Sequence, residues 1–288
     1  MVLSPLHSLR VVLLGLVLLS SACSPIKALN AIAPGGAQRS VGVEYGDGPR
    51  QHVDIYKPAG LQGAAPVVLF FYGGSWNSGS REDYAFVGEA LAGRGIVTLI
   101  ADYRLYPEVR YPEFLRDNAA ALAWAVDNVA EYGGDPQRIF LMGHSSGAYN
   151  AAMLALDPRW RTEVGVRDDV IKGWIGLAGA YDFLPIENPE VKPVFFHPHS
   201  PRDSQPINQV HAGAPPALLM AANDDDLVDP QRNSEGLARR LRDAGVPVQE
   251  RYYSRPDHRT LVASLTWPLR WLAPTLDESV AFIHSTAP

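Results

Sequence analysis

The chain has 288 residues, 47% of them hydrophobic, and a formal net charge of −6. This length is in the range of one large α/β domain, and the acidic balance excludes the basic surface that nucleic-acid binding needs, so we expect no nucleic-acid partner. Cys23 is the only cysteine, which excludes an intramolecular disulfide.

The N-terminal residues have the pattern of a targeting segment. Arg10 precedes an uncharged apolar run at residues 11–19, and Ser-Ser-Ala-Cys follows at residues 20–23. The run is too short to favour a spanning helix, which needs about 20 residues. The pattern resembles a bacterial lipoprotein signal. An ordinary secretory signal with an incidental cysteine is the alternative interpretation.

A lipoprotein signal implies removal of residues 1–22 and lipid attachment at Cys23, which would anchor the protein to a membrane of the bacterial cell envelope. Ser24, and not an acidic residue, follows the cysteine, which is compatible with the periplasmic face of the outer membrane. Residues 23–40 contain prolines and glycines, and we expect a tether there that is flexible at the glycines. Residues 41–288 would then form the folded domain.

Apolar runs and alternating patterns predict the strands and helices of this domain. Residues 66–72 form a continuous apolar run, which is typical of a strand buried on both faces of a parallel sheet. Residues 41–45 and 52–56 alternate apolar and polar side chains around a glycine-rich turn, which predicts an antiparallel pair at the sheet edge. Further strands are predicted at 96–102, 138–142, 174–177, 217–221 and 248–253, and helices at 84–91, 112–132, 148–154, 231–244 and within 269–283. This alternation predicts an α/β fold with a mostly parallel central sheet flanked by helices.

One connection of this domain is unusually long. Roughly 40 residues separate the strands predicted at 174–177 and 217–221, and residues 185–215 are rich in proline with little helical periodicity. A connection of this length without regular structure is uncommon in a compact domain unless it has a function. We therefore interpret residues 185–215 as a short cap-like segment over a site.

The motif Gly143-His144-Ser145-Ser146-Gly147 lies between a predicted strand and a predicted helix. The two glycines remove Cβ atoms that would collide at a sharp turn, and such a turn would expose the Ser145 hydroxyl. The helix that follows would direct its first N–H groups toward a developing oxyanion. This is the pattern of a nucleophile elbow, although the motif alone is equally compatible with a glycine- and serine-rich loop.

Candidates for the other groups of a serine hydrolase follow other predicted strands. Gly73 and Gly74 come directly after the first buried strand, where their main-chain N–H groups and that of Ser146 would form an oxyanion hole. A plain Gly-Gly turn is the alternative. The run Asp224-Asp225-Asp226 and His258 follow the last two predicted strands. The resulting order of serine, aspartate and histidine is the one expected for α/β hydrolases.

Five motifs carry a family resemblance: Gly73-Gly74-x-Trp76, Gly133-Gly134-Asp135-Pro136, Gly143-His144-Ser145, Asp225-x-x-Val228 and His258. They resemble the carboxylesterase branch of the α/β hydrolases that includes hormone-sensitive-lipase-like, acetyl-xylan and feruloyl-type esterases, isoprenylcysteine methylesterase and arylformamidase. The resemblance covers nearly everything from about Val41 onward. It departs at Tyr72, where many members have histidine, and at Ser146, where alanine is commoner.

The resemblance implies an α/β-hydrolase catalytic domain over residues 41–288. Such a domain would hydrolyse a small-molecule ester through an acyl-enzyme, without a metal or an organic cofactor. Ser145 would be the nucleophile, His258 the base, and Asp225 the acid that orients the base. The oxyanion donors would be the main-chain N–H groups of Gly73, Gly74 and Ser146.

Two alternatives to the esterase hypothesis stay open. Arylformamidase or another amidase activity would use the same groups. A non-catalytic envelope lipoprotein that uses the fold for binding belongs to a different class, but the three groups in their expected order argue against it. Near the motifs, we expect His144 to pack or hydrogen-bond and not to act as a second base, and we expect Trp76 to belong to the core.

Overall fold

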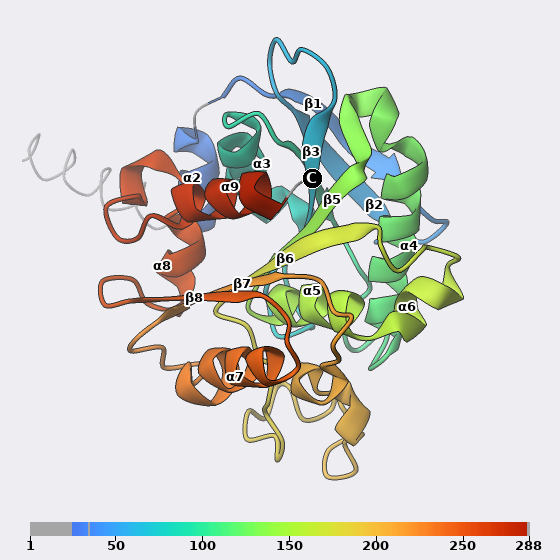
Figure 1. Ribbon diagram of the computed structural model, residues 1–288, viewed down its shortest axis with the longest axis vertical. Helices are drawn as coiled ribbons and strands as arrows, with labels where there is room; N and C mark the ends of the chain where they lie inside the picture. The colour runs from blue at the N-terminus through green and yellow to red at the C-terminus, as the bar shows by residue number, and fades with distance from the viewer. Residues whose placement is uncertain (1–24, 34, 287–288) are drawn as a thin grey trace, which may run out of the picture.

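A computed structural model of the protein describes residues 25–33 and 35–286. An eight-stranded sheet runs through the molecule, with helices on both faces (Figure 1). The strand order is β1-β2-β4-β3-β5-β6-β7-β8. β1 pairs antiparallel with β2, β2 pairs antiparallel with β4, and the remaining neighbours are parallel. The strands are β1 (Gln38–Glu44), β2 (His52–Lys57), β3 (Ala65–Phe71), β4 (Val97–Ala101), β5 (Gly134–His144), β6 (Ile171–Leu177), β7 (Ala217–Ala222) and β8 (Val248–Tyr253).

The centre of the sheet is apolar on both faces. Every residue of β3, β4 and β7 is buried, as the continuous apolar runs predicted for strands covered on both sides by helices. The carboxyl ends of these parallel strands meet at one edge of the sheet, so the loops that follow β3, β5, β7 and β8 are brought together there. All predicted strands are present, and the predicted α/β fold with a mostly parallel sheet is confirmed.

Helices cover both faces of the sheet. α2, α3 and α9 lie on one face, and α4, α5 and α7 lie on the other (Figure 1). The α-helices are α2 (Pro25–Ile32), α3 (Ala85–Ala92), α4 (Glu113–Asn128), α5 (Ser146–Leu156), α6 (Pro158–Glu163), α7 (Gly236–Asp243), α8 (His258–Ala263) and α9 (Thr275–Thr286). The helix predicted at 231–244 begins as a π-helical turn at Gln231–Glu235. The short helices α6 and α8 have only six residues each, which is too few for periodicity to show.

The N-terminal part of the described chain differs from the expected tether. Residues 25–32 form helix α2, and Asn30 bonds to the domain twice: its Nδ2 donates to the carbonyl of Glu82, and its Oδ1 accepts from the main-chain N–H of Phe86. β1 begins at Gln38, inside the range predicted as tether. The structure therefore contains a helix at residues 25–32 and the start of a strand at residues 38–40, within the range where the sequence predicted a tether.

The cap-like segment is mostly irregular, as predicted, with short 3-10 helices at Arg202–Ser204 and Pro206–Gln209. It is nevertheless anchored, because Val194 and Phe195 are buried and Tyr149 of α5 donates a hydrogen bond to the carbonyl of Ser204 at 2.7 Å. Within residues 25–33 and 35–286, none of the helices has the length and apolar character needed to cross a bilayer.

Candidate active site

The turn between β5 and α5 holds Ser145 in a rare backbone conformation, with φ 54° and ψ −122°. A non-glycine residue in such a region costs of order 1–3 kcal/mol, so the surrounding structure must impose it. The main-chain N–H of Ser145 donates to the carbonyl of Leu177 at 2.8 Å, which ties the turn to β6. The predicted nucleophile elbow therefore has the backbone of a strained strand-to-helix turn.

The glycines on both sides of this turn are required by close main-chain contacts. A Cβ on Gly143 would lie 2.2 Å from the carbonyl oxygen of Gly147, and a Cβ on Gly147 would lie 2.0 Å from the carbonyl oxygen of Phe71. Real Cβ atoms do not approach this closely. The start of α5 thus packs directly on the end of β3, and only glycine permits that approach.

Three side chains form a continuous hydrogen-bonded chain at this edge of the sheet. Ser145 Oγ lies 2.9 Å from His258 Nε2, and His258 Nδ1 lies 2.7 Å from Asp225 Oδ2. The side chains of His258 and Asp225 are 5% and 0% exposed. The structure thus brings together, in the predicted order, three residues that are far apart in the sequence.

The surroundings of Asp225 favour its charged form. Burial acts to raise the pKa of this carboxyl, and the hydrogen bond and charge of His258 act to lower it. The main-chain N–H groups of Leu227 and Val228 also donate to Asp225 Oδ1, each at 2.9 Å. The net result is a lowered pKa. A carboxylate held in this way can orient the imidazole of His258 and stabilise its positive charge.

His258 is the first residue of α8, and its backbone is fixed from two sides. Asp257 caps the helix by accepting from the main-chain N–H groups of Arg259 and Thr260, and Thr260 returns a bond to the N–H of Asp257 in a capping box. On the other side, His144 Nε2 lies 2.9 Å from the carbonyl oxygen of His258. These contacts set the position of the imidazole before any substrate binds.

The loop after β3 approaches the elbow closely. A Cβ on Gly73 would lie 2.9 Å from Ser145 Cβ, and one on Gly74, whose φ is +138°, would lie 2.2 Å from the carbonyl oxygen of Ser78. The carbonyl of Gly74 accepts from the N–H groups of Asn77 and Ser78. Both glycines are therefore needed for the shape of this loop. Among the described residues that line the adjacent cavity, the loop contributes Ser75 and Trp76.

Tyr72, at the place where the resembling family has histidine, is held by charged partners. Its hydroxyl donates to Asp102 Oδ1 at 2.8 Å and accepts from Arg50 Nη2 at 2.6 Å. Arg50 also donates to the carbonyl of Gly79 at 2.7 Å, and the N–H of Arg81 donates to Asp102 at 2.9 Å. This network joins both ends of the loop that contains Gly73 and Gly74. Sequence reasoning did not find Arg50, Arg81 or Asp102, because no motif marks them.

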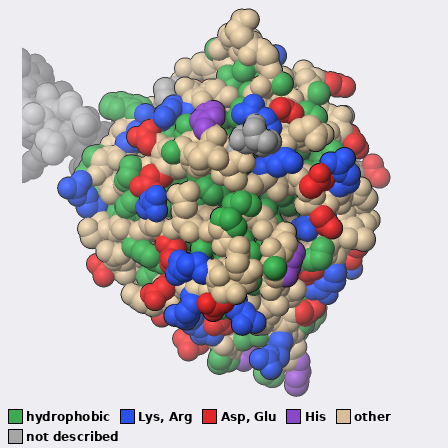
Figure 2. Space-filling model, in the orientation of Figure 1, with side chains coloured by type: hydrophobic (Ala, Val, Ile, Leu, Met, Phe, Trp, Pro, Cys, Tyr) green, Lys and Arg blue, Asp and Glu red, His purple; other side chains and the backbone are tan. Residues whose placement is uncertain are grey.

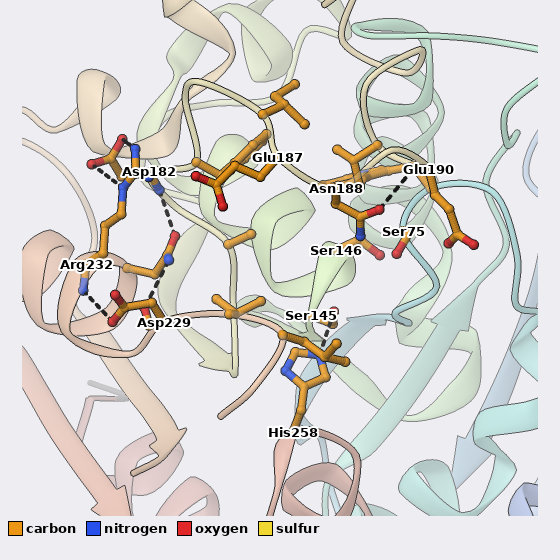
Figure 3. Close-up of a pocket in the computed structure, with 18 of the residues that line it drawn as sticks. Ser75, Ser145, Ser146, Asp182, Glu187, Asn188, Glu190, Asp229, Arg232 and His258 are labelled. Carbon is orange, nitrogen blue, oxygen red and sulfur yellow. Dashed lines mark hydrogen bonds and ion pairs between the residues drawn. The ribbon is translucent and has the colours of Figure 1, made fainter. Parts of the chain in front are cut away.

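A cavity of about 500 Å³ opens beside Ser145 and His258. Its opposite side comes from the chain after β6, and Figure 3 shows Glu187 and Asn188 across the cavity from the serine and the imidazole. The size is that of a site for a small organic molecule. The described residues that line it include Ser75, Trp76, Ser145, Ser146, Phe183, Ile186, Glu187, Asn188, Val191, Val228 and His258.

The sequence model of the BD-FAE family matches residues 53–241, which is more than half of the chain. This chain belongs to the BD-FAE family. The matched range includes the elbow, the loop after β3 and Asp225, whereas His258 lies beyond it.

Curated relatives and solved structures agree with this assignment. A probable isoprenylcysteine alpha-carbonyl methylesterase of Arabidopsis thaliana is 30% identical over 76% of this chain and 50% of its own length. Esterase LipC of Mycobacterium tuberculosis is 33% identical over 69% of this chain and 54% of its own. The chain thus spans about half the length of these relatives. Esterase B from Lactobacillus rhamnosis has a similar structure, with a TM-score of 0.76 at 19% identity over 96% of both chains. The predicted α/β-hydrolase fold and carboxylesterase family are confirmed.

In this BD-FAE chain, His144 is buried beside the imidazole of His258, with the ring centroids 5.1 Å apart. Burial, followed by the charge of His258, lowers the pKa of His144 to about 3. A neutral ring whose Nε2–H donates to a carbonyl acts as a hydrogen-bonding and packing residue, as expected. Trp76 is also buried, with its edge against Tyr149 and Phe195, so it belongs to the core and borders the cavity as well.

The far side of the cavity contains polar residues that the motifs did not indicate. Arg232 and Asp182 form an ion pair at 3.2 Å, and Asn233 Oδ1 accepts from the N–H groups of Tyr181 and Asp182 at 2.7 and 2.9 Å. Asn233 therefore fixes the start of the chain that leads into the cap-like segment. The length of the connection and its prolines signalled that segment, but no residue pattern signalled the ion pair.

Proposed function

We propose that this chain is a serine carboxylic-ester hydrolase that acts through an acyl-enzyme. The observation that carries the proposal is the hydrogen-bonded chain from Ser145 through His258 to Asp225 at the wall of a cavity of about 500 Å³. Family membership and the esterase relatives support it. The substrate is a small ester, since the cavity has the volume of a small-molecule site.

In the proposed mechanism, His258 Nε2 takes the proton of Ser145 as Oγ attacks the ester carbonyl carbon. The oxyanion that forms accepts hydrogen bonds from the main-chain N–H groups of Gly73, Gly74 and Ser146. Protonated His258 then gives its proton to the alkoxide, and the alcohol leaves. A water molecule, activated by the same imidazole, hydrolyses the acyl-serine and restores the enzyme. Asp225 holds the imidazole tautomer throughout.

A panel of p-nitrophenyl esters from acetyl to palmitoyl, assayed beside N-formylkynurenine, tests this proposal. An esterase hydrolyses the short esters with saturation kinetics, and Ser145→Ala does not. Turnover of N-formylkynurenine well above that of every ester would favour the amidase alternative. An absence of turnover on all substrates, with no acyl-enzyme detected, would favour a binding protein and contradict the proposal.

We further propose that the protein is a lipoprotein of the bacterial cell envelope, anchored through lipid on Cys23 after removal of residues 1–22. The support is the sequence alone, since Arg10, the apolar run at 11–19 and the small residues before the cysteine lie outside the described residues. Mass spectrometry of the mature N-terminus tests it. A diacylglyceryl-modified Cys23 is expected, and Cys23→Ala should remove the protein from the membrane fraction or leave it unprocessed. An unmodified N-terminus at another residue would contradict it.

A further inference from the structure

Two tryptophans on the surface stand out from the other tryptophans of the chain. Trp267 and Trp271 are 61% and 64% exposed, whereas Trp76, Trp160 and Trp174 are buried. Burying a large aromatic side chain is among the strongest apolar contributions to folding or binding. Two exposed tryptophans four residues apart therefore indicate a surface that contacts something apolar.

Trp267 lies beside the first described helix, and the main chain of Trp271 is held by Arg255. Trp267 Nε1 donates to the carbonyl of Ile32, the last residue of α2, at 3.2 Å. Arg255 Nη1 donates to the carbonyl of Trp271 at 2.9 Å. Figure 1 shows the red segment between α8 and α9 beside α2. Because the indole N–H of Trp267 is already bonded, its exposed surface is the apolar part of the ring. Ile32 is itself 47% exposed.

Basic side chains accompany these apolar ones. Lys27 of α2 and Arg255 are exposed, and Arg270 lies between the two tryptophans. Arg255 and Arg270 donate to main-chain carbonyls, at 2.9 and 3.4 Å, and a neutral acceptor leaves the positive charge uncompensated. The face drawn in Figure 2 mixes basic and acidic side chains, so a broad basic field does not extend over it. Tryptophan with nearby lysine and arginine is the composition found at membrane interfaces.

We propose that the surface formed by Ile32, Trp267, Trp271 and their basic neighbours, here called the tryptophan face, docks on the lipid bilayer. The proposal rests on the lipid anchor proposed at Cys23. α2 begins at Pro25, two residues after that cysteine, and an extended chain spans at most about 3.6 Å per residue. A lipid on Cys23 would therefore hold the start of α2 within about 7 Å of the bilayer surface. The tryptophan face is bonded to the other end of this eight-residue helix, which is about 12 Å long, so it would lie within about 20 Å of that surface.

The tryptophan face does not include the lining of the candidate active site. His258 is the first residue of α8 and Trp267 follows the end of that helix, and Ile32, Trp267 and Trp271 are absent from the described residues that line the cavity. The indole rings would enter the headgroup region, and the basic side chains would meet lipid phosphates. The lipid anchor would then fix the orientation of the enzyme as well as its location.

Quenching of tryptophan fluorescence by lipids brominated on their acyl chains tests the proposal. The full chain, expressed with its own signal, is reconstituted in phosphatidylethanolamine–phosphatidylglycerol vesicles with and without brominated phosphatidylcholine. Two of the six tryptophans belong to the tryptophan face, and only side chains at the bilayer come close to the bromine atoms. Bromine should therefore remove up to about a third of the tryptophan emission. Trp267→Phe with Trp271→Phe should abolish most of that loss. Trp124→Phe is the matched control, because α4, which contains Trp124, lies across the molecule from α2 in Figure 1. Bromine should quench the emission of this variant as it does in wild type.

Equal quenching in wild type and the double variant would overturn the proposal, because another surface would then face the lipid. Absence of quenching in wild type would also overturn it, and sedimentation showing a dimer would identify a second copy as the occupant. Hydrolysis of a soluble ester should stay within about twofold in the double variant, which reports intact folding. Mass spectrometry of Cys23 tests the lipid anchor, and the ester assay tests the proposed activity. Because these measurements are independent of the quenching, the failure of either proposal is distinguishable from the failure of docking.

Discussion

The two sides of the cavity are built in different ways. On one side, Ser145 and its partners are held by main-chain contacts that exclude a Cβ atom, by a strained turn, and by hydrogen bonds to buried charges. On the other side, residues 187–190 are exposed and belong to an irregular segment. The same cavity thus has one wall with little freedom to change and one wall whose side chains project into solvent.

The two walls therefore serve different purposes. Chemistry needs atoms placed to within tenths of an ångström, and such placement comes from packed main chain and buried hydrogen bonds. Selection among substrates tolerates looser contacts, and exposed loop residues supply them. We therefore expect changes on the elbow side to lower kcat by orders of magnitude, and changes on the cap-like side to alter KM modestly.

The largest expected effect belongs to Ser145→Ala. The variant removes the proposed nucleophile and little packing, so kcat should fall by about 10⁴-fold or more while the fold is kept. Steady-state kinetics with p-nitrophenyl butyrate and circular dichroism measure the two parts. Activity within about tenfold of wild type would contradict the mechanism, since a triad serine costs far more.

Asp225→Asn comes next, with an expected loss in kcat of about 10²- to 10⁴-fold, because an amide presents the wrong partner to the imidazole. Asp224→Asn and Asp226→Asn are matched controls, since both side chains are exposed and flank Asp225. They should stay near wild type under the same assay. A larger loss of kcat in either control would show that the orienting carboxylate is Asp224 or Asp226 and not Asp225.

Gly74→Val should lower kcat by about 10²- to 10³-fold, the typical cost of losing an oxyanion donor. Its Cβ would lie 2.2 Å from the carbonyl oxygen of Ser78 at a φ of +138°, so the loop must change shape.

Tyr72→Phe is the contrasting change on the same loop, because the variant loses only the hydroxyl that braces the loop. Asp102 and Arg50 each lose their hydrogen bond to the Tyr72 hydroxyl. The loss should lower the free energy of unfolding by about 1.5–3 kcal/mol. kcat/KM should stay within about tenfold of wild type. Equal damage by both changes, with folding intact, would make the Tyr72 hydroxyl a donor to the transition state.

His144→Asn should change the pH dependence of stability. The pKa of His144 is lowered to about 3 in the folded protein, below the value of about 6.5 for an unfolded chain. The unfolded chain therefore binds the proton first, so stability is full above pH 6.5 and is lost as pH falls toward 3. A single such group contributes about 1.4 kcal/mol per pH unit in that window. Denaturant unfolding at pH 6 and pH 4 measures how the free energy of unfolding changes with pH. The change should be smaller in the variant than in wild type, and an identical change would contradict the lowered pKa of His144.

The smallest expected effect is that of Glu187→Gln on the cap-like side. The carboxylate faces the cavity but is exposed (Figure 3), and solvent and salt screen exposed charges. KM for a neutral ester should change by less than about threefold, with kcat unchanged. A loss of kcat above about tenfold would place Glu187 in the chemical step and remove the contrast between the two walls.

A feature of this structure was predictable from the sequence where its physical cause is local. The strands and the Gly-x-Ser-x-Gly turn are signalled by local patterns, because buried parallel strands need apolar runs and close main-chain approach needs glycine. Asp225 is singled out among three neighbouring aspartates by the family resemblance. The network of Arg50, Arg81 and Asp102 depends on contacts between distant segments and leaves no local pattern. Helix α2 was not foreseen for a similar reason, since Asn30 is held by residues more than 50 positions away.

Labelling with a fluorophosphonate, followed by intact-mass and peptide mass spectrometry, shows whether Ser145, His258 and Asp225 act together. Such a reagent reacts rapidly only with a serine that a neighbouring base activates. The structure predicts one adduct per chain, located on Ser145, with labelling abolished by His258→Ala although the serine remains. An adduct on another residue, or undiminished labelling of Ser145 without the imidazole, would contradict the assignment of Ser145, His258 and Asp225 as a catalytic unit.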